Sequence, residues 1–307
     1  MKPKTNIVWL KRDLRLTDHA PLYEANCRDE QFLLLYIFEP SLMNDSHTDM
    51  RHWRFIQQSL SDIEKILVKR NKQLSIAHGE ADQIFSELTN QYEITNVFSH
   101  EETGLKLTFE RDKKLKKFFN ANKIQWHEYQ TNAVIRGLNN RKRWEKQWDK
   151  VMREEIKPIN LARANIIFHP FPISEIPKFG DDVNHQVGGC LPGQKEMHDF
   201  FETRGQDYFK FISKPDKSRT SCSRLSPYIA YGNLSMREVY QTLLKSWNKP
   251  GWRRSMAALS SRLHWHCHFI QKYESEIEIE DLPINRGYKD FPYKVINCEH
   301  EDFLAWA

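Results

Sequence analysis

The residues best placed to do chemistry lie in one stretch, 219–240. Its first half is rich in small polar side chains and ends at Pro227, which suits the first turn of a helix because a missing N–H is no loss there. Free backbone N–H groups and hydroxyls that lead into a helix can hold a phosphate. The small polar residues are Thr220, Ser221, Cys222, Ser223 and Ser226. The pattern therefore predicts an anion site, and an ordinary serine-rich turn is the alternative.

Residues 232–238 carry signals for the end of one helix and the start of the next. Gly232 and Asn233 are typical of a helix end. Ser235, followed three residues later by Glu238, forms the Ser-x-x-Glu pattern of a helix start. The anion site is therefore expected to lie between two short helices.

This stretch resembles the flavin-pocket motif of the DNA photolyase/cryptochrome family. The matching residues are Ser-Arg-Leu-Ser-Pro-Tyr from 223 and Tyr-Gly-Asn-Leu-Ser-x-Arg-Glu-Val-Tyr from 231. The family's Thr before this motif falls on Cys222, whose thiol is a weaker hydrogen-bond partner than a hydroxyl. The resemblance implies FAD contacts from the loop and from one aromatic residue ahead of it: Tyr208, Ser223, Leu225 and Ser226.

Residues 9–22 resemble the opening motif of the same family. They read Trp-Leu-Lys-Arg-Asp-Leu-Arg-Leu-Thr-Asp-His-Ala-Pro-Leu, and His19 stands where the family has Asn. The charges in this stretch predict an ion-pair network at the end of a strand, with single solvated charges as the alternative. The charged residues are Lys11, Arg12, Asp13, Arg15 and Asp18.

The first 130 residues alternate strand and helix patterns. Short β-prone runs are separated by apolar residues at helical spacing, such as Ile56, Leu60, Ile63 and Leu67. This alternation predicts an α/β domain with a doubly wound parallel sheet. No Gly-x-Gly-x-x-Gly follows the first run, which argues against a standard dinucleotide fingerprint. The predicted strands are 7–10, 32–38, 74–77, 97–99 and 124–129.

In the family, this α/β domain carries an optional light-harvesting pigment. The resemblance therefore implies a second chromophore of folate or deazaflavin type. Glu101 and Glu102 follow the strand at 97–99, at the edge where open parallel sheets bind ligands. Nothing in the sequence selects a pigment, and an empty groove is the alternative.

The chain is predicted to have three parts: an α/β antenna domain (1–130), a connector (131–195) and the first part of an all-helical FAD-binding domain (196–307), which is incomplete here. In the connector, Trp144 and Trp148 share one face of a charged helix. We interpret that face as packing on the body, with a nucleic-acid surface as the alternative. The proline-rich end of the connector predicts a long loop.

Residues 255–274 resemble the family helix whose tryptophan borders the lesion-binding cavity. Trp265 takes that position, and stacking on a flipped-out base contributes about 1–3 kcal/mol. Arg262 and His266 stand where many members have Glu and Arg, so the lesion specificity stays open. The resemblance implies DNA contacts from Arg224, Arg262, Trp265 and His266, and a core position is the alternative for Trp265.

Histidines on the same stretch permit two other chemistries. His264 and His268 lie four residues apart with Cys267 beside them, a spacing that can place metal ligands on one helix face. No Glu follows His264 and no third ligand is evident, so we predict no metal site. Alternatively, His264, His266 or His268 supplies a proton, as a histidine does in some family members that repair a second photoproduct.

The composition is compatible with this interpretation. The 307 residues suffice for about two domains, and the formal charge of +5 permits a polyanionic partner without requiring one. The five cysteines have no paired spacing, which predicts reduced thiols. No apolar run approaches the length of a signal peptide or a membrane span. We therefore predict a monomeric cytoplasmic protein with no membrane contact.

The resemblance implies FAD-dependent, blue-light-driven repair of pyrimidine dimers in DNA, with dimer-containing DNA as the partner. The second hypothesis is a cryptochrome-type blue-light receptor without repair activity, and the third is a truncated, non-functional paralogue or fragment. No catalytic residue is singled out. Residues 285–307 resemble the segment that precedes the family's next motif, so the chain is expected to end within the FAD-binding domain.

Overall fold

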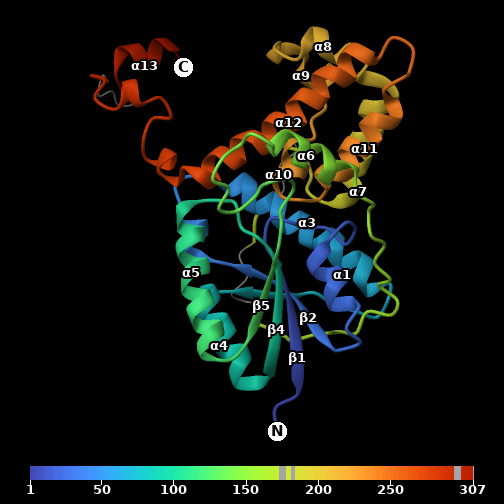
Figure 1. Cartoon of the computed structure of the whole chain (residues 1–307), viewed down its shortest axis with the longest axis vertical. Helices are drawn as coiled ribbons and strands as arrows, with labels where there is room; N and C mark the ends of the chain where they lie inside the picture. The colour runs from blue at the N-terminus through green and yellow to red at the C-terminus, as the bar shows by residue number, and fades with distance from the viewer. Residues whose placement is uncertain (173–177, 181–183, 294–298, 307) are drawn as a thin grey trace.

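A parallel sheet forms the centre of the N-terminal half (Figure 1). The computed structural model describes residues 1–172, 178–180, 184–293 and 299–306. The strand order is β3-β2-β1-β4-β5, and neighbouring strands pair in parallel. The bounds are β1 Lys4–Leu10, β2 Phe32–Phe38, β3 Ser75–His78, β4 Glu93–His100 and β5 Gln125–Tyr129. The predicted doubly wound parallel sheet is confirmed.

Helices cover both faces of the sheet because successive side chains of a strand point to opposite faces. Val8 and Leu34 belong to one buried cluster with α1 and α3, and Ile7 and Leu33 belong to another with α4 and α5. β2 is buried along its whole length, as expected of a strand covered on both faces. The helices are α1 Ala20–Asn26, α2 Pro40–Met43, α3 Met50–Val68, α4 Ala81–Gln91 and α5 Lys106–Ala121.

The rest of the described chain is mainly helical and packs around a third buried cluster. The predicted aromatic stripe of the connector lies on α6, and both Trp144 and Trp148 are buried in this cluster. A short strand that the sequence did not predict, β6, pairs with β2. The bounds are α6 Trp144–Arg153, β6 Ile166–Ile167, α7 Cys190–Asp199, η2 Phe200–Arg204, α8 Tyr208–Phe211, η3 Pro215–Lys217, α9 Ser218–Ser221, α10 Ser226–Ala230, α11 Met236–Ser246 and α12 Arg253–Ser275.

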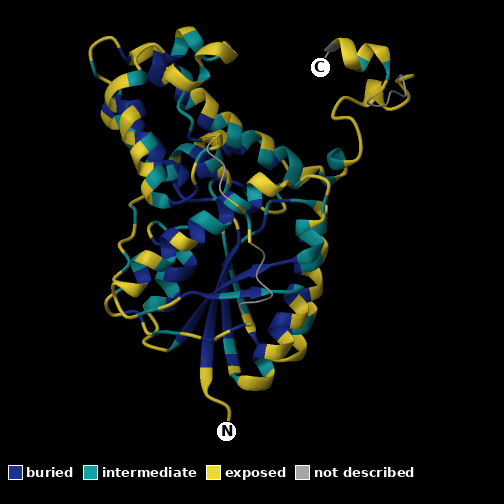
Figure 2. Cartoon of the chain, turned by 180° about the vertical axis from the view of Figure 1, so that it is seen from behind, coloured by how far each residue is buried: buried dark blue, intermediate teal, exposed yellow. Residues whose placement is uncertain are grey.

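Three short elements follow α12: η4 Ile277–Glu280, η5 Arg286–Tyr288 and α13 Glu301–Trp306. η4 still contacts α5, where Glu280 accepts the Lys106 N–H over 2.7 Å. Beyond η4 the chain leaves the body (Figure 1), and residues 282–293 are exposed throughout (Figure 2). Parts of the predicted loop at 168–195 and of the segment 285–307 lie outside the described residues. No helix in the described part of the chain is long and apolar enough to cross a membrane.

The loop after β1 joins the sheet to the helical part. Leu14 donates its N–H to the Tyr231 carbonyl over 3.0 Å, and its own carbonyl accepts from the Asn233 side chain over 3.0 Å. Gly232 has φ +70°, and a Cβ there would lie 2.5 Å from the Arg12 carbonyl oxygen. Only glycine therefore fits this close approach without strain.

Candidate functional site

The predicted anion site forms a loop between α9 and α10, and we call residues 222–226 the phosphate cradle. Upstream of it, Thr220 and Ser221 belong to the short helix α9, so part of the hydroxyl-rich stretch is helical. Pro227 lies in the first turn of α10, as its ring geometry favours. Ser235 caps α11 by accepting the Glu238 N–H over 2.9 Å. The predicted helix signals around the loop are confirmed.

The backbone of the phosphate cradle has the form of an anion-binding nest. Arg224 has φ +57°, in the left-handed region, and Leu225 follows in the right-handed region with φ −87° and ψ −11°. When a residue in the left-handed conformation is followed by one in the right-handed conformation, successive backbone N–H groups point toward one position. Among the described residues, no acceptor receives the N–H groups of Ser223, Arg224 or Ser226. The cradle therefore offers unused donors to an anion.

Two of the predicted FAD contacts are buried side chains of the helical part. Tyr208 is 6% exposed and Leu225 is 1% exposed, and the Tyr208 ring packs edge-on against Phe200 at 5.4 Å between centroids. Burial raises the pKa of Tyr208 to about 12; Cys222 adds to this shift, while Arg262 opposes it. Tyr208 and Leu225 belong to the same buried cluster as Leu259 of α12. Ser223 is half-buried and Ser226 is exposed.

The outer face of α12 carries two of the predicted DNA contacts. Trp265 is 49% exposed and meets the ring of Phe269, itself 53% exposed, edge-on at 6.0 Å. The Arg262 guanidinium lies 5.0 Å from the centre of the Trp265 ring, within cation–π range. Trp265 is therefore a surface residue rather than a core one, and the structure brings it together with Arg262.

His266 lies apart from this exposed pair. It lines a small cavity between α12 and the carboxyl end of the sheet, together with His100 and Thr131. Burial and the nearby Arg12 lower the pKa of His266 to about 4, so the ring is neutral at pH 7. The structure thus places His266 at the junction with the α/β domain and not beside Trp265.

The other histidines of α12 pack among aromatic rings. His264 lies edge-on to Trp144 at 5.0 Å and to Trp148 at 5.1 Å between centroids. Cys267 is fully buried. Among the described residues, these side chains do not form a metal-type cluster; the cluster that the structure contains lies elsewhere.

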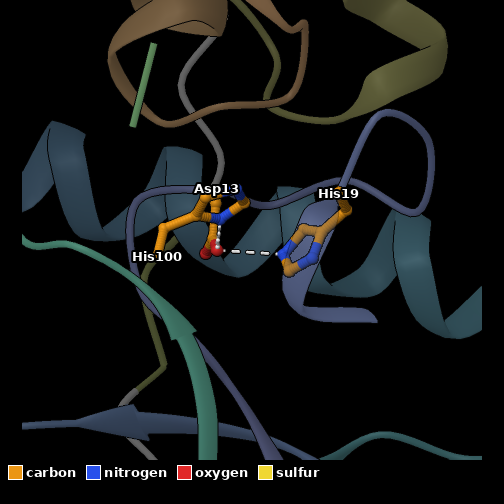
Figure 3. Close-up of side chains that lie close together, drawn as sticks. All are labelled: Asp13, His19 and His100. Atoms are coloured by element: carbon orange, nitrogen blue, oxygen red, sulfur yellow. Dashed lines mark hydrogen bonds and ion pairs between the residues drawn. The ribbon is translucent and has the colours of Figure 1, made fainter. Parts of the chain in front are cut away.

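That cluster joins Asp13, His19 and His100 under the loop after β1 (Figure 3). Asp13 Oδ2 lies 2.9 Å from His19 Nε2 and 2.6 Å from His100 Nδ1, while Asp13 Oδ1 accepts the Lys11 N–H over 2.7 Å. Burial alone would raise the pKa of Asp13, but its interactions with His19 and His100 outweigh burial and hold the pKa well below its usual range. Asp13 is therefore a buried carboxylate.

A metal ion would need lone pairs from all three side chains of this cluster, and the hydrogen bonds oppose that. His19 Nδ1 accepts the Leu22 N–H over 3.1 Å at the start of α1, so the proton of this ring lies on Nε2, facing Asp13. A protonated nitrogen cannot bind a metal. Burial lowers the pKa of His100 to about 4, so the His100 ring is neutral at pH 7 and donates through Nδ1. We therefore assign a cluster held by the hydrogen bond from His100 to Asp13, with His19 Nε2 in close contact with the same carboxylate but without hydrogen-bond geometry.

The ion-pair network predicted for this loop is wrong in its partners. Asp13 interacts with histidines, and Asp18 pairs with Arg237 of α11 at 2.9 Å. Lys11 lies 3.4 Å from Asp112 of α5. The sequence reasoning missed His100 because a histidine at a strand end carries no signal of its own. The one sequence signal for this cluster was His19, which stands where the family motif has Asn.

A second cavity opens beyond the carboxyl ends of β1 and β2 and is also lined by Glu102 and Leu105, which follow β4. Such a position is the usual ligand site of an open parallel sheet. Among the described residues, nothing hydrogen-bonds Glu39 Oε2 or Trp53 Nε1, both of which are buried in the wall of this cavity. Burial raises the pKa of Glu39 to about 7, against the opposing effect of Arg111. Of the two predicted residues, Glu102 lines both this cavity and the one beside His266, and Glu101 lines only the latter.

Comparison with known proteins supports the resemblance. The family model described as DNA photolyase matches residues 6–147. Cryptochrome DASH of Synechocystis sp. is 26% identical over 329 residues, which cover 95% of this chain and 65% of that protein. A chloroplastic/mitochondrial cryptochrome DASH of Arabidopsis thaliana is 30% identical over 268 residues, 76% of this chain and 46% of that protein. The chain thus spans two thirds or less of these relatives.

Solved structures share the fold. A bacterial class III photolyase from Agrobacterium tumefaciens matches with a TM-score of 0.78 and 18% identity, over 100% of this chain and 66% of that one. An archaeal photolyase from Sulfolobus tokodaii, solved with two FAD molecules, matches with a TM-score of 0.73 and 20% identity. The match covers 98% of this chain and 66% of the photolyase chain. On the family match, the curated relatives and the shared fold, this chain belongs to the photolyase/cryptochrome family.

Proposed function

We propose that the chain binds FAD at the phosphate cradle and serves blue-light-driven repair of pyrimidine dimers in DNA. The observation that carries this proposal is the nest at Arg224 and Leu225, whose neighbouring N–H groups have no acceptor among the described residues. A diphosphate is an anion of matching charge and size for such a nest. The exposed Trp265 on the same helical part supplies the second element.

The residues of the cradle divide into two roles in this proposal. Ser223 and Ser226 hold the diphosphate through their hydroxyls and N–H groups, and Arg224 contributes its backbone N–H while its side chain faces DNA. Tyr208 and Leu225, both buried, support the loop from beneath. Bound FAD would supply the light-driven electron transfer, and the protein contributes binding and orientation.

The outer face of α12 is the proposed DNA side. Trp265 offers a stacking surface to an unpaired base, and Arg262 adds positive charge directly over the indole. His266 is the weakest member of the predicted set, because it lines the cavity at the domain junction. A protein that uses Arg262 in this way should bind DNA with a marked salt dependence.

The cavity at Glu39 is the proposed site for a second chromophore of folate or deazaflavin type. Glu39 Oε2 would accept a hydrogen bond from such a ring, and Trp53 Nε1 would donate one, which satisfies two buried atoms that lack partners among the described residues. The Sulfolobus tokodaii photolyase contains two FAD molecules, so a flavin is a further candidate for this cavity. We propose that the protein acts as a cytoplasmic monomer.

The first test is an absorption spectrum of the purified chain between about 300 and 500 nm, before and after addition of FAD. We expect a structured flavin band and, under blue light, loss of dimers from an irradiated oligonucleotide. Ser223→Ala with Ser226→Ala should weaken the flavin band, whereas Ser213→Ala, an exposed serine outside the cradle, should not. A chain that stays colourless with excess FAD would contradict the proposal.

A cryptochrome-type receptor is the second candidate, favoured by the names of the curated relatives. Both candidates predict bound flavin, and they differ in DNA binding. Dimer-specific binding that weakens steeply with salt supports repair. A flavin band without preference for dimer-containing DNA, and without dimer loss in light, supports the receptor.

A further inference from the structure

A turn of π-helix precedes the phosphate cradle in sequence and lies beneath it in space. In η2 the Gly205 N–H donates to the Phe200 carbonyl, five residues back, over 2.9 Å. A Cβ at Gly205 would lie 2.5 Å from that carbonyl oxygen, so this turn requires glycine. Single π-turns are rare and frequently occur at functional sites. The last residue of the turn is Arg204.

Arg204 uses its guanidinium to bind the backbone of the cradle. Its Nε donates to the Cys222 carbonyl over 3.0 Å, and its Nη2 donates to the Ser223 carbonyl over 2.9 Å. Arg204 also binds two carboxylates: Nη2 donates to Glu196 Oε2 over 2.7 Å, and Nη1 to Asp199 Oδ2. A longer contact of 3.4 Å joins Nη2 to the Glu196 carbonyl. The side chain is only 11% exposed. At least four of its five N–H donors are engaged, which leaves little for direct contact with a ligand.

These bonds fix the direction of the N–H groups that the cradle presents. In a trans peptide the C=O and the N–H of the same plane point in opposite directions. Because Arg204 holds the carbonyls of Cys222 and Ser223, the N–H groups of Ser223 and Arg224 point away from it. Gln186 binds the Arg224 carbonyl over 2.8 Å and has the same effect on the Leu225 N–H. Hydrogen bonds of this kind also offset the strain of a non-glycine residue at positive φ.

We propose that Arg204 is the positioning residue of the phosphate cradle, because it holds the peptide planes whose N–H groups receive a diphosphate. This inference rests on the proposed function, in which the diphosphate is that of FAD. Arg204 acts through the loop and not by contact with the phosphates. Its positive charge is balanced by Glu196 and Asp199, so its contribution is orientation rather than attraction.

The test compares three probes that share only a diphosphate: FAD, ADP and inorganic pyrophosphate. Their dissociation constants are measured by calorimetry on the full chain, on Arg204→Ala and on Arg204→Lys. We expect Arg204→Ala to weaken all three by a similar factor of about ten to a hundred, as for loss of one to two charge-assisted hydrogen bonds. Arg204→Lys, which can bind only one carbonyl well, should lose less. Retention of fold is checked by circular dichroism, and Arg204→Lys provides the measurement if the alanine variant does not fold.

Lys249→Ala is the matched control. Lys249 binds the same π-helical turn, donating to the Phe201 carbonyl over 2.8 Å and to Glu202 Oε2 over 2.9 Å. Among the described residues, it forms no hydrogen bond or ion pair with the cradle. It should leave the three dissociation constants unchanged within about twofold. An equal loss in this variant would show a structural role for the turn as a whole and overturn the proposal.

The remaining outcomes separate the two proposals. Unchanged affinities in both Arg204 variants would overturn the positioning role and leave FAD binding intact. A loss for FAD alone, with ADP and pyrophosphate unaffected, would also overturn it, because the shared diphosphate would then not be the affected group. A chain that binds pyrophosphate in an Arg204-dependent manner but not FAD would support the positioning role and refute the proposed function. Failure of the unmodified chain to bind any probe would refute both.

Discussion

Replacing His100 by Asn should make the protein less sensitive to acid. His100 Nδ1 lies 2.6 Å from Asp13 Oδ2, and the Asn amide nitrogen can occupy a similar place and donate the same hydrogen bond. The substitution removes a titrating group and keeps a donor. Burial lowers the pKa of His100 to about 4 in the folded protein, against about 6.5 in an unfolded chain.

The sign and size of the effect follow from these two pKa values. Between about pH 6.5 and pH 4 the unfolded chain takes up a proton at His100 that the native protein does not, so stability falls as the pH falls. The slope reaches about 1.4 kcal/mol per pH unit for one proton, and the integrated loss is about 3 kcal/mol. Asp13 acts in the same direction but at lower pH, because its folded pKa is depressed and its contribution is lost below about pH 3.9. His266, with a pKa lowered to about 4, steepens the curve of both proteins equally.

The assay is urea unfolding followed by circular dichroism, at half-unit steps from about pH 7.5 to about pH 4.5. The free energy of unfolding of His100→Asn should fall less steeply than that of the unmodified protein, and the gap between the two curves should change by about 2.5 kcal/mol across the window. His47→Asn is the control, because His47 is exposed and its ring pairs with Asp45 of its own loop. Parallel curves for His100→Asn and the unmodified protein would refute the reasoning, since His100 would then titrate alike in both states.

Three further predictions follow from single contacts. Gly232→Ala should destabilise the protein by more than about 1 kcal/mol, seen as a lower urea midpoint, because its Cβ would lie 2.5 Å from the Arg12 carbonyl oxygen at φ +70°. In the unmodified protein, the raised pKa of Glu39 lets only the native state keep its proton, so the free energy of unfolding should fall by up to about 3 kcal/mol as the pH rises from about 4.5 to about 7. Glu39→Gln should remove this fall. Equal pH profiles of the two proteins would contradict the prediction. Trp265→Ala should change the unfolding free energy by less than about 0.5 kcal/mol but weaken binding of dimer-containing DNA about five- to a hundredfold in a binding titration. If Trp265 were a core residue, Trp265→Ala would instead lower the unfolding free energy and leave DNA binding unchanged.

The sheet could be predicted from the sequence because its signals are local. The run at 32–38 is apolar almost throughout and is β2 in the structure, residue for residue. The helical spacing from Ile56 to Leu67 is the buried face of α3. β6 was missed because two residues carry no periodicity. Its pairing with β2 depends on the path of the connector around the sheet, which is a property of the tertiary structure.

The candidate site was predictable only where its signals are local. Pro227, Gly232 and Ser235 mark helix ends and a start through their own backbone chemistry, and the structure has them there. Arg204 gave no such signal, because its role depends on carbonyls 18 and 19 residues away. His100 and Asp13 meet across 87 residues. Contacts of that separation require the strand order, which one sequence does not determine.

The same long-range contacts connect the acid-sensitive cluster to the phosphate cradle. Asp13 fixes the loop after β1 through the Lys11 N–H, and the next residue, Leu14, binds the backbone of Tyr231 at the end of α10. α10 begins at the cradle, so the geometry of the cradle depends on two supports: Arg204 from the helical part and the β1 loop from the sheet. Loss of the Asp13 cluster should therefore weaken diphosphate binding as well as the stability of the sheet. The pyrophosphate affinity of His100→Asn should not change near neutral pH, because the hydrogen bond to Asp13 is retained. Asp13→Ala should reduce both the pyrophosphate affinity and the stability of the protein. An unchanged affinity in Asp13→Ala would show that Arg204 alone holds the cradle.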